Sequence, residues 1–413
     1  MQTQTLAIDF GTSNTAAAVP FDHGIYRIPV ERGAETLPTA VFFPAEGGTM
    51  RIGVAAAEAL VAGDDGRYMR ALKSVLGLPL LQEERLVGGK RRSLSGIITA
   101  FLTELRQRAE TATGLTFRTA LSGRPVHFHT ADLDKDAQAE ADLRACYLAA
   151  GFDAVSFLAE PEAAAIACQG MGAGDEIGLI VDIGGGTSDF SVFRNDGARP
   201  RILANHGIRL GGTDFDQALS LAHAMPVLGL GSELRRDMGA GLLPVPRAPY
   251  VDLATWAKIP FLYTPETRRM AAEMARLAVE PEKMARLVTV LDNELGHDLA
   301  FAVERAKIGA NGGRNEGRIA MGSIERGLSA PVTPDDLEAV LSGHRTRLTD
   351  AARETLTLAG IAPGDVGRII LVGGSSLMRI VSDEMQALCP NGTVLRSEAF
   401  TAVVDGLALA AKA

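Results

Sequence analysis

The chain has 413 residues, of which 46% are apolar, and a formal net charge of −9. This length and apolar content are sufficient for the cores of two substantial lobes. The negative net charge argues against a nucleic-acid partner or an anionic membrane surface, because both bind basic faces.

The cysteines and the N-terminus indicate a cytoplasmic protein. Cys146, Cys168 and Cys389 are odd in number and far apart, which is typical of reduced thiols. The first residues lack the basic start of a signal peptide, and no apolar run of about eighteen residues is free of charge. We therefore expect the protein in the cytoplasm.

Residues 5–19 have the pattern of a strand, a turn and a second strand. An apolar run ends at Asp9, and Phe10 follows it. The turn at residues 11–14 combines glycine with hydroxyl and amide side chains, and after Thr15 the residues 16–19 are again apolar.

Residues 31–95 are irregular, so we interpret them as an insertion on the first lobe. Within them, Lys73 follows a stretch that we predict to be helical and precedes Gly77. Most lysines are solvated surface groups, and the sequence pattern by itself gives Lys73 no other role.

The next segments alternate helices with strands. The apolar spacing predicts helices at residues 94–112 and 137–150, with a strand at 120–126 between them. His127 and His129 alternate with Phe128 and are predicted to share one strand face, where two histidines without a third ligand are structural. At residue 161 a proline opens an alanine-rich helix and leaves Glu160 at the junction, either as a functional carboxylate or as a capping acid.

Residues 178–192 repeat the N-terminal pattern. An apolar strand ends at Asp182, three glycines follow at 184–186, and residues 187–192 alternate polar with apolar. A second strand therefore leaves the turn, where a Rossmann or Walker motif would start a helix. Successive amides in such a turn can bind phosphate, although a simple glycine-rich hairpin is an equal alternative for this stretch alone. Because Asp9 and Asp182 are about 170 residues apart, we infer a duplicated domain-sized unit whose halves face one cleft.

Two more glycine pairs occur further along the chain. Gly211 and Gly212 precede a helix predicted at residues 217–224, and Gly373 and Gly374 follow a buried strand at 367–372. Between them, residues 281–308 are predicted to be helical with a break near Gly296, and residues 334–359 form a long amphipathic helix. Glu304 and Lys307 lie three positions apart on one helix face, where a surface ion pair is the simplest interpretation.

These motifs together resemble the seventy-kilodalton heat-shock chaperones, within the actin-like ATPase superfamily, and the resemblance covers almost the whole chain. It is carried by the two aspartate–glycine turns, the Glu160–Pro161 helix and the Gly373–Gly374 turn. Residues 210–216 and 304–307 match the chaperone branch, and residues 73–77, 122–125 and 225–229 resemble its bacterial YegD-like subgroup.

The resemblance implies an α/β fold of two duplicated lobes with ribonuclease H-like sheets that flank a nucleotide cleft. Lobe I would cover residues 1–168, with the insertion at about 31–95, and lobe II residues 169–413, with an insertion at about 213–330. It implies ATP or ADP and Mg²⁺ as ligands, ATP hydrolysis as the reaction, and unfolded proteins or co-chaperones as partners. A divalent cation is also expected because a triphosphate facing two aspartates would be repelled.

Roles for individual residues follow from the same resemblance. Asp9 and Asp182 would hold magnesium through water, Lys73 would orient the attacking water, and Glu160 would assist the metal shell. The expected catalytic residues are Lys73, Glu160, Asp182 and Thr187, and the expected nucleotide contacts are Asp9, Gly11, Thr12, Ser13, Asn14, Gly184, Gly185, Gly186, Thr187, Gly211, Gly212, Thr213, Glu304, Lys307, Asn311, Gly373, Gly374 and Ser375.

The sequence also departs from the family pattern. Leu377 stands where an arginine stacks on adenine in the family, and Asn311 replaces a nucleoside-binding serine. The sequence given ends where the family's interdomain linker would begin, so a peptide-binding domain is not expected within it. A sugar- or acetate-type kinase of the same superfold and a nucleotide-gated scaffold or filament protein are the alternatives, and Lys73 with Glu304 and Lys307 favours the chaperone type.

Overall fold

The computed structural model describes residues 4–21, 24–129, 132–167, 176–195, 200–312, 317–396 and 401–411. These residues form two compact units, one made of residues 1–212 with 345–413 and the other of residues 213–344. The second unit contains the insertion predicted at about 213–330. The predicted lobe boundary at residues 168–169 and Cys168 lie outside the described residues.

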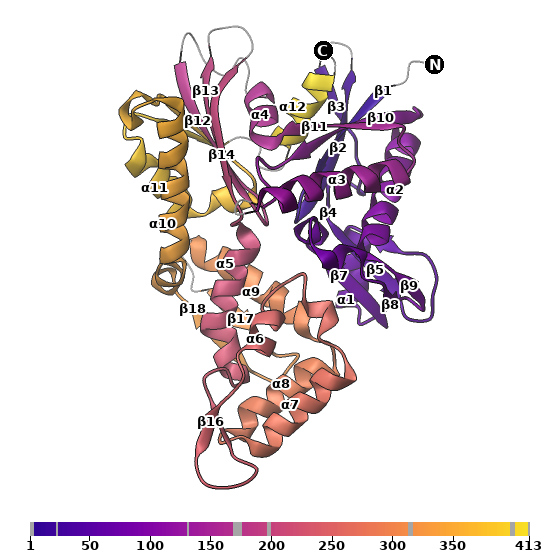
Figure 1. Cartoon of the computed structure of the whole chain (residues 1–413), viewed down its shortest axis with the longest axis vertical. Coiled ribbons are helices and arrows are strands. Elements are labelled where there is room, and N and C mark those ends of the chain that lie inside the picture. Colours follow the sequence, from indigo (N-terminus) through magenta and orange to yellow (C-terminus); the bar gives the residue numbers. More distant parts are fainter. Residues whose placement is uncertain are drawn as a thin grey trace. The chain divides into compact units, whose positions relative to one another are not determined.

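Two sheets with the same topology form the first unit (Figure 1). In each, the first strand pairs antiparallel with the second strand, and it pairs parallel with β10 in the first sheet and with β19 in the second. The first sheet contains β1 (Gln4–Phe10), β2 (Asn14–Phe21), β3 (Gly24–Arg27), β4 (Thr36–Pro38), β10 (Phe117–Arg124) and β11 (Ala154–Ala159), and the second contains β12 (Glu176–Ile183), β13 (Ser188–Asn195), β14 (Arg201–Ile208), β19 (Arg368–Val372) and β20 (Thr393–Arg396). The strand orders β3-β2-β1-β10-β11 and β14-β13-β12-β19-β20 correspond one to one, which confirms the predicted duplication.

The helices of the first unit follow apolar periodicity in the sequence. The predicted helix at 94–112 is α2 (Leu94–Thr113), and its buried residues include Ile97, Phe101 and Leu105 at helical spacing. Further helices of this unit are α3 (Leu133–Ala149), α4 (Glu160–Ala167), α11 (Arg379–Leu388) and α12 (Ala402–Ala411), and α10 (Pro334–Ala359) begins in the second unit.

Most of the insertion predicted at residues 31–95 forms a small sheet and short helices of its own, whereas β4 joins the first sheet. The strand order is β6-β5-β7, beside the hairpin of β8 and β9. The elements are β5 (Ala40–Pro44), β6 (Arg51–Ile52), α1 (Val54–Val61), β7 (Gly66–Arg70), β8 (Arg85–Val87) and β9 (Lys90–Arg92), with 3₁₀ turns at Leu72–Val75 and Pro79–Gln82.

The second unit is mainly helical. The predicted break near Gly296 is confirmed, because one helix ends at Asp292 and the next begins at Gly296. Its elements are α5 (Gly212–Leu219), β15 (Glu233–Arg235), β16 (Leu242–Pro244), α6 (Ala248–Leu253), α7 (Pro265–Leu277), α8 (Pro281–Asp292), α9 (Gly296–Asn311), β17 (Gly317–Ala320) and β18 (Ser329–Val332).

Three local predictions were wrong. Lys73 follows a strand, β7, and lies in a 3₁₀ turn, because Ala71 has a left-handed backbone (φ 60°) that ends the strand. Helix α5 begins at Gly212, five residues before the predicted start, so the glycine pair lies at its N-terminus. His127 and His129 lie in a loop, because β10 ends at Arg124 and Pro125 has no N–H for the ladder.

Among the described residues, no helix is both long and apolar enough to cross a membrane. The core between α4, α12 and the two sheets consists largely of alanine and valine, with Ala163, Ala164 and Val404 fully buried. Gly406 lies where α12 crosses α4, and a Cβ there would overlap the backbone of Ala163. Small residues thus let the C-terminal helix pack closely on α4 (Figure 1).

The close crossing of α12 over α4 leads to a prediction about stability. We expect Gly406→Ala to lower the free energy of unfolding by roughly 1–3 kcal/mol, because the added methyl has no room. Gly343→Ala is the matched control: it lies exposed on α10 with open space around it, and should stabilise by about 0.5–1 kcal/mol. Denaturant unfolding of both variants checks this, and an unchanged Gly406→Ala protein would contradict it.

Candidate functional site

The two aspartate–glycine turns have the same local structure. In the first, the Gly11 amide donates to the Asn14 carbonyl at 3.0 Å, and in the second the Gly184 amide donates to the Thr187 carbonyl at 3.0 Å. Each turn connects the first two antiparallel strands of its sheet. The duplicated sheets therefore present duplicated turns.

The absence of side chains lets these turns approach each other. A Cβ at Gly185 would overlap the Ser13 hydroxyl oxygen, and one at Gly186 would lie 3.1 Å from Thr12 Oγ1. Position 185 must therefore be glycine for the two turns to approach this closely. Backbone amides and hydroxyls from both sheets are thereby gathered in one place.

Two further glycine segments join this place. The Gly212 amide donates to the Gly184 carbonyl at 3.0 Å, and a Cβ at Gly212 would overlap Ser375 Oγ. Gly373 has φ +80°, and a Cβ there would lie 2.7 Å from Asp182 Oδ1. The predicted phosphate segments at residues 11–14, 184–187 and 211–212 and the predicted nucleoside segment at 373–375 thus lie together in the first unit.

A buried ion pair lies at the same site. Lys73 Nζ contacts Glu160 Oε1 at 2.6 Å, and their side chains are 7% and 12% exposed. Burial by itself would lower the pKa of Lys73, but the negative charges of Glu160 and Asp9 raise it by more. The net shift of the pKa is therefore upward, and the ammonium stays charged. The structure therefore brings together two residues that the sequence placed in different segments.

Three more carboxyl groups share this environment. Burial, then Glu160, raises the pKa of Asp9 to about 7 and that of Asp189 to about 8, although Lys73 lowers both. Burial, then Glu160 and Asp189, raises the pKa of Asp182 well above its usual value. The carboxyl groups at this site thus outnumber the Lys73 ammonium, and the site favours an added cation.

The excess of carboxyl groups bears on whether these residues could hold the magnesium ion that the family resemblance implies. Within the described ranges, no three His, Cys, Asp or Glu side chains are grouped as direct metal ligands. Asp9 and Asp182 lie beside amides and hydroxyls that suit phosphate oxygens, and Mg²⁺ is usually held by one or two carboxylates, water and substrate phosphates. The residues present fit magnesium held in that way.

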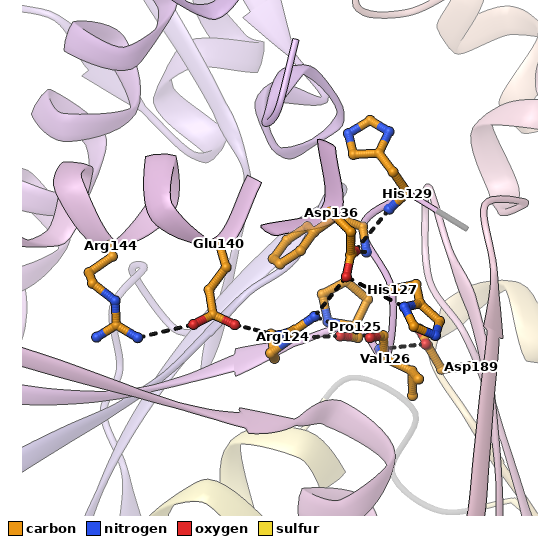
Figure 2. Close-up of polar contacts among 10 residues, drawn as sticks. Arg124, Pro125, Val126, His127, His129, Asp136, Glu140, Arg144 and Asp189 are labelled. Carbon is orange, nitrogen blue, oxygen red and sulfur yellow. Dashed lines mark hydrogen bonds and ion pairs between the residues drawn. The ribbon is translucent and has the colours of Figure 1, made fainter. Parts of the chain in front are cut away.

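A network of polar contacts shapes the loop after β10 (Figure 2). From α3, Asp136 Oδ1 accepts the amides of Phe128 at 2.6 Å and His129 at 3.1 Å, and Glu140 pairs with Arg124 and Arg144. From β13, Asp189 Oδ1 accepts the Val126 amide at 2.7 Å. The loop is therefore tied to α3 and to the second sheet, and its Phe128 ring lies 5.9 Å from Lys73 Nζ.

The remaining predicted nucleotide contacts belong to the second unit. Glu304, Lys307 and Asn311 lie on α9, and Thr213 lies on α5. Lys307 Nζ pairs at 2.7 Å with Asp216, whose other oxygen accepts the Trp256 indole N–H at 3.1 Å. Lys307 therefore also stabilises this unit internally, and its contact with a nucleoside stays a prediction.

Sequence reasoning missed three residues at the site. Asp189 is buried and ties the β10 loop to β13, and Arg209 and His129 contact each other at 3.0 Å. Asp189 lies in the same strand–turn–strand motif as Asp182 and pairs with it across the hairpin. This position in the motif could have identified Asp189 as a site residue from the sequence. Nothing in the sequence indicates that Arg209 and His129 are in contact.

The pKa of Asp189 predicts a pH dependence. The native carboxyl keeps its proton up to about pH 8, whereas the unfolded chain releases it near its ordinary value, so this group lowers stability as pH rises between them. In protein without metal or nucleotide, Asp189→Asn should reduce the loss of stability between about pH 5.5 and 8.5 by roughly 1–3 kcal/mol.

Asparagine can still accept the Val126 amide, so the variant should fold. Denaturant unfolding at both pH values measures the effect, with Asp350→Asn, an exposed carboxyl on α10, as the control. Equal pH slopes for the wild type and Asp189→Asn would show that Asp189 ionises normally.

Several known proteins resemble this chain along most of its length. The family model for the Hsp70 protein matches residues 81–225. The chaperone protein DnaK of Thermosipho melanesiensis is 26% identical over 95% of this chain and 57% of its own length. The chaperone protein HscA homolog of Bordetella pertussis is 28% identical over 93% of this chain and 54% of its own.

The DnaK of Methanothermobacter thermautotrophicus is 27% identical over 91% of this chain and 54% of its own length. The chain thus spans just over half the length of the curated relatives it matches. The matches extend along nearly the whole chain, and the duplicated sheets and gathered turns are those expected of the actin-like ATPase fold. The chain is thus similar to Hsp70-family chaperones along nearly its whole length, and the comparisons support a nucleotide-binding domain of the Hsp70 type.

Proposed function

We propose that this chain binds ATP with Mg²⁺ at the gathered glycine turns and hydrolyses it to ADP and phosphate. The observation that carries the proposal is the meeting of the turns at residues 11–14 and 184–187, beside the buried Lys73–Glu160 pair. Backbone amides in such turns bind phosphate oxygens, and a charged group nearby can act on the phosphate that leaves.

Each group has a chemical task in this proposal. Magnesium, when bound, would neutralise phosphate charge, and Asp9 and Asp182 would hold it through water. Thr12 and Thr187 donate hydroxyl hydrogen bonds to phosphate oxygens. Glu160 fixes the position of the Lys73 ammonium, which orients the attacking water and stabilises charge as the terminal phosphate is released.

The relatives are named as chaperones, so we extend the proposal to a chaperone-type ATPase in the cytoplasm with unfolded proteins or co-chaperones as partners. The kinase and scaffold alternatives predict different outcomes. A kinase would release little phosphate without an acceptor, and a scaffold would assemble on ATP, which light scattering would detect.

The first prediction from this proposal concerns the metal. ATP binding should weaken at least tenfold, or about 1.4 kcal/mol, when magnesium is removed, because the site then sets a triphosphate against several carboxylates. Calorimetric titration with Mg–ATP and with ATP in excess chelator measures this change. Equal affinities would contradict a role for the metal.

The second prediction concerns Lys73. Lys73→Met keeps an unbranched aliphatic side chain but removes the charge, so turnover should fall roughly 10²-fold. The dissociation constant for Mg–ATP should change little, since other groups hold the ground state. Single-turnover hydrolysis and calorimetry on the same protein separate these two effects.

Lys258→Ala is the matched control, because Lys258 is half-exposed and pairs with Asp252 in the second unit. It should change neither turnover nor binding. If binding of Lys73→Met falls as much as its turnover, then Lys73 is a ground-state ligand and not a catalytic group.

A further inference from the structure

A small pocket opens beside the two glycine turns in the first unit. Its lining combines two cationic side chains with three hydroxyls and a turn glycine, which is the chemistry that binds a tetrahedral oxyanion. The lining residues are Thr12, Lys73, Ser74, Leu76, Pro125, Phe128, His129, Gly186, Thr187 and Arg209.

Arg209 enters this pocket from the segment between β14 and α5. Its Nη1 lies 3.0 Å from His129 Nδ1, and its Nη2 donates to the Ser74 carbonyl at 2.9 Å. Arg209 thereby joins the second sheet to residues that belong to the first sheet's lobe. The Arg209 carbonyl in turn accepts a hydrogen bond of 3.4 Å from Arg347 on α10.

His129 is built to accept this hydrogen bond. Its side chain is 7% exposed, and its Nε2 lies 2.8 Å from the Leu76 carbonyl, which can only accept. Nε2 therefore carries the proton, and Nδ1 presents a lone pair to Arg209. The neutral tautomer of His129 thus fixes one arm of the guanidinium.

The hydrogen bonds that orient the Arg209 guanidinium make it ready to bind an anion. A guanidinium is a planar fork of N–H donors, and two bonds set its plane before any ligand arrives, which lowers the entropy lost on binding. Glu160 already balances the charge of Lys73, which lines the same pocket. Arg209 therefore adds a second, oriented cation next to Thr12 and Thr187.

We propose that Arg209 binds the terminal phosphate of the bound nucleotide and makes the site prefer a triphosphate to a diphosphate. His129 is its positioning residue, since it acts only through Arg209. This inference rests on the proposed function, because the turns that line the pocket must hold the preceding phosphates. It assigns Arg209 and His129, neither of which was among the sequence-predicted site residues.

The test compares two ligands on one variant. We titrate Mg–ADP and the magnesium complex of a non-hydrolysable ATP analogue into the wild type and Arg209→Ala by calorimetry. Loss of one charged hydrogen-bonding group should weaken triphosphate binding about tenfold or more, and diphosphate binding less than about twofold. Arg209 is exposed, so its removal leaves no buried cavity, and an unchanged melting temperature without nucleotide confirms folding.

Arg353→Ala is the control, because this exposed arginine on α10 pairs with Asp350 and does not line the pocket. It should leave both affinities unchanged. His129→Ala should weaken triphosphate binding in the wild type but add almost nothing in the Arg209→Ala background, since a double-mutant cycle detects residues that act as one unit. Independent losses would overturn the positioning role.

The other outcomes are also decisive. If Arg209→Ala weakens both ligands equally or neither, while the wild type binds them, the inference is wrong and the proposed function stands. If the wild type binds neither nucleotide, the proposed function fails and the inference fails with it.

Discussion

The site depends on one buried ion pair among several carboxyl groups. Lys73 and Glu160 meet at 2.6 Å with little exposure, and Asp9, Asp182 and Asp189 all have raised pKa values because water is largely excluded. Removing one member of a buried pair leaves an uncompensated charge, which is costly. A surplus of buried carboxyl groups is also costly in a folded protein, unless a cation or protons offset it. We infer that these buried carboxyl groups are retained, despite their cost in stability, because they prepare the site for a metal–phosphate complex.

The duplicated fold explains how a chain assembles such a site. Each sheet supplies one aspartate at the end of its first strand and one glycine turn, and the small residues of α4 and α12 pack between the sheets. Glycine at position 185 then allows the turns to approach within contact of Thr12 and Ser13. The phosphate site that we propose uses groups from both turns, so the proposed function is a property of the pair.

Much of the fold could be predicted from the sequence, because apolar periodicity and turn glycines are local signals. The strand–turn–strand motifs, α2, α10 and the break at Gly296 all follow from them. The errors occurred where tertiary structure decides: Ala71 adopts a left-handed backbone without being glycine, and the loop after Pro125 is held by side chains from α3 and β13. The Arg209–His129 contact joins residues 80 positions apart and has no local signal.

The central claim is that both glycine turns hold the same phosphate groups. A crystal structure with magnesium and a non-hydrolysable ATP analogue tests it most directly. The account predicts that the phosphates contact backbone amides at residues 11–14 and at 184–187, while Lys73 keeps its contact with Glu160. Phosphates bound by only one turn, or a nucleotide bound elsewhere on the chain, would contradict it.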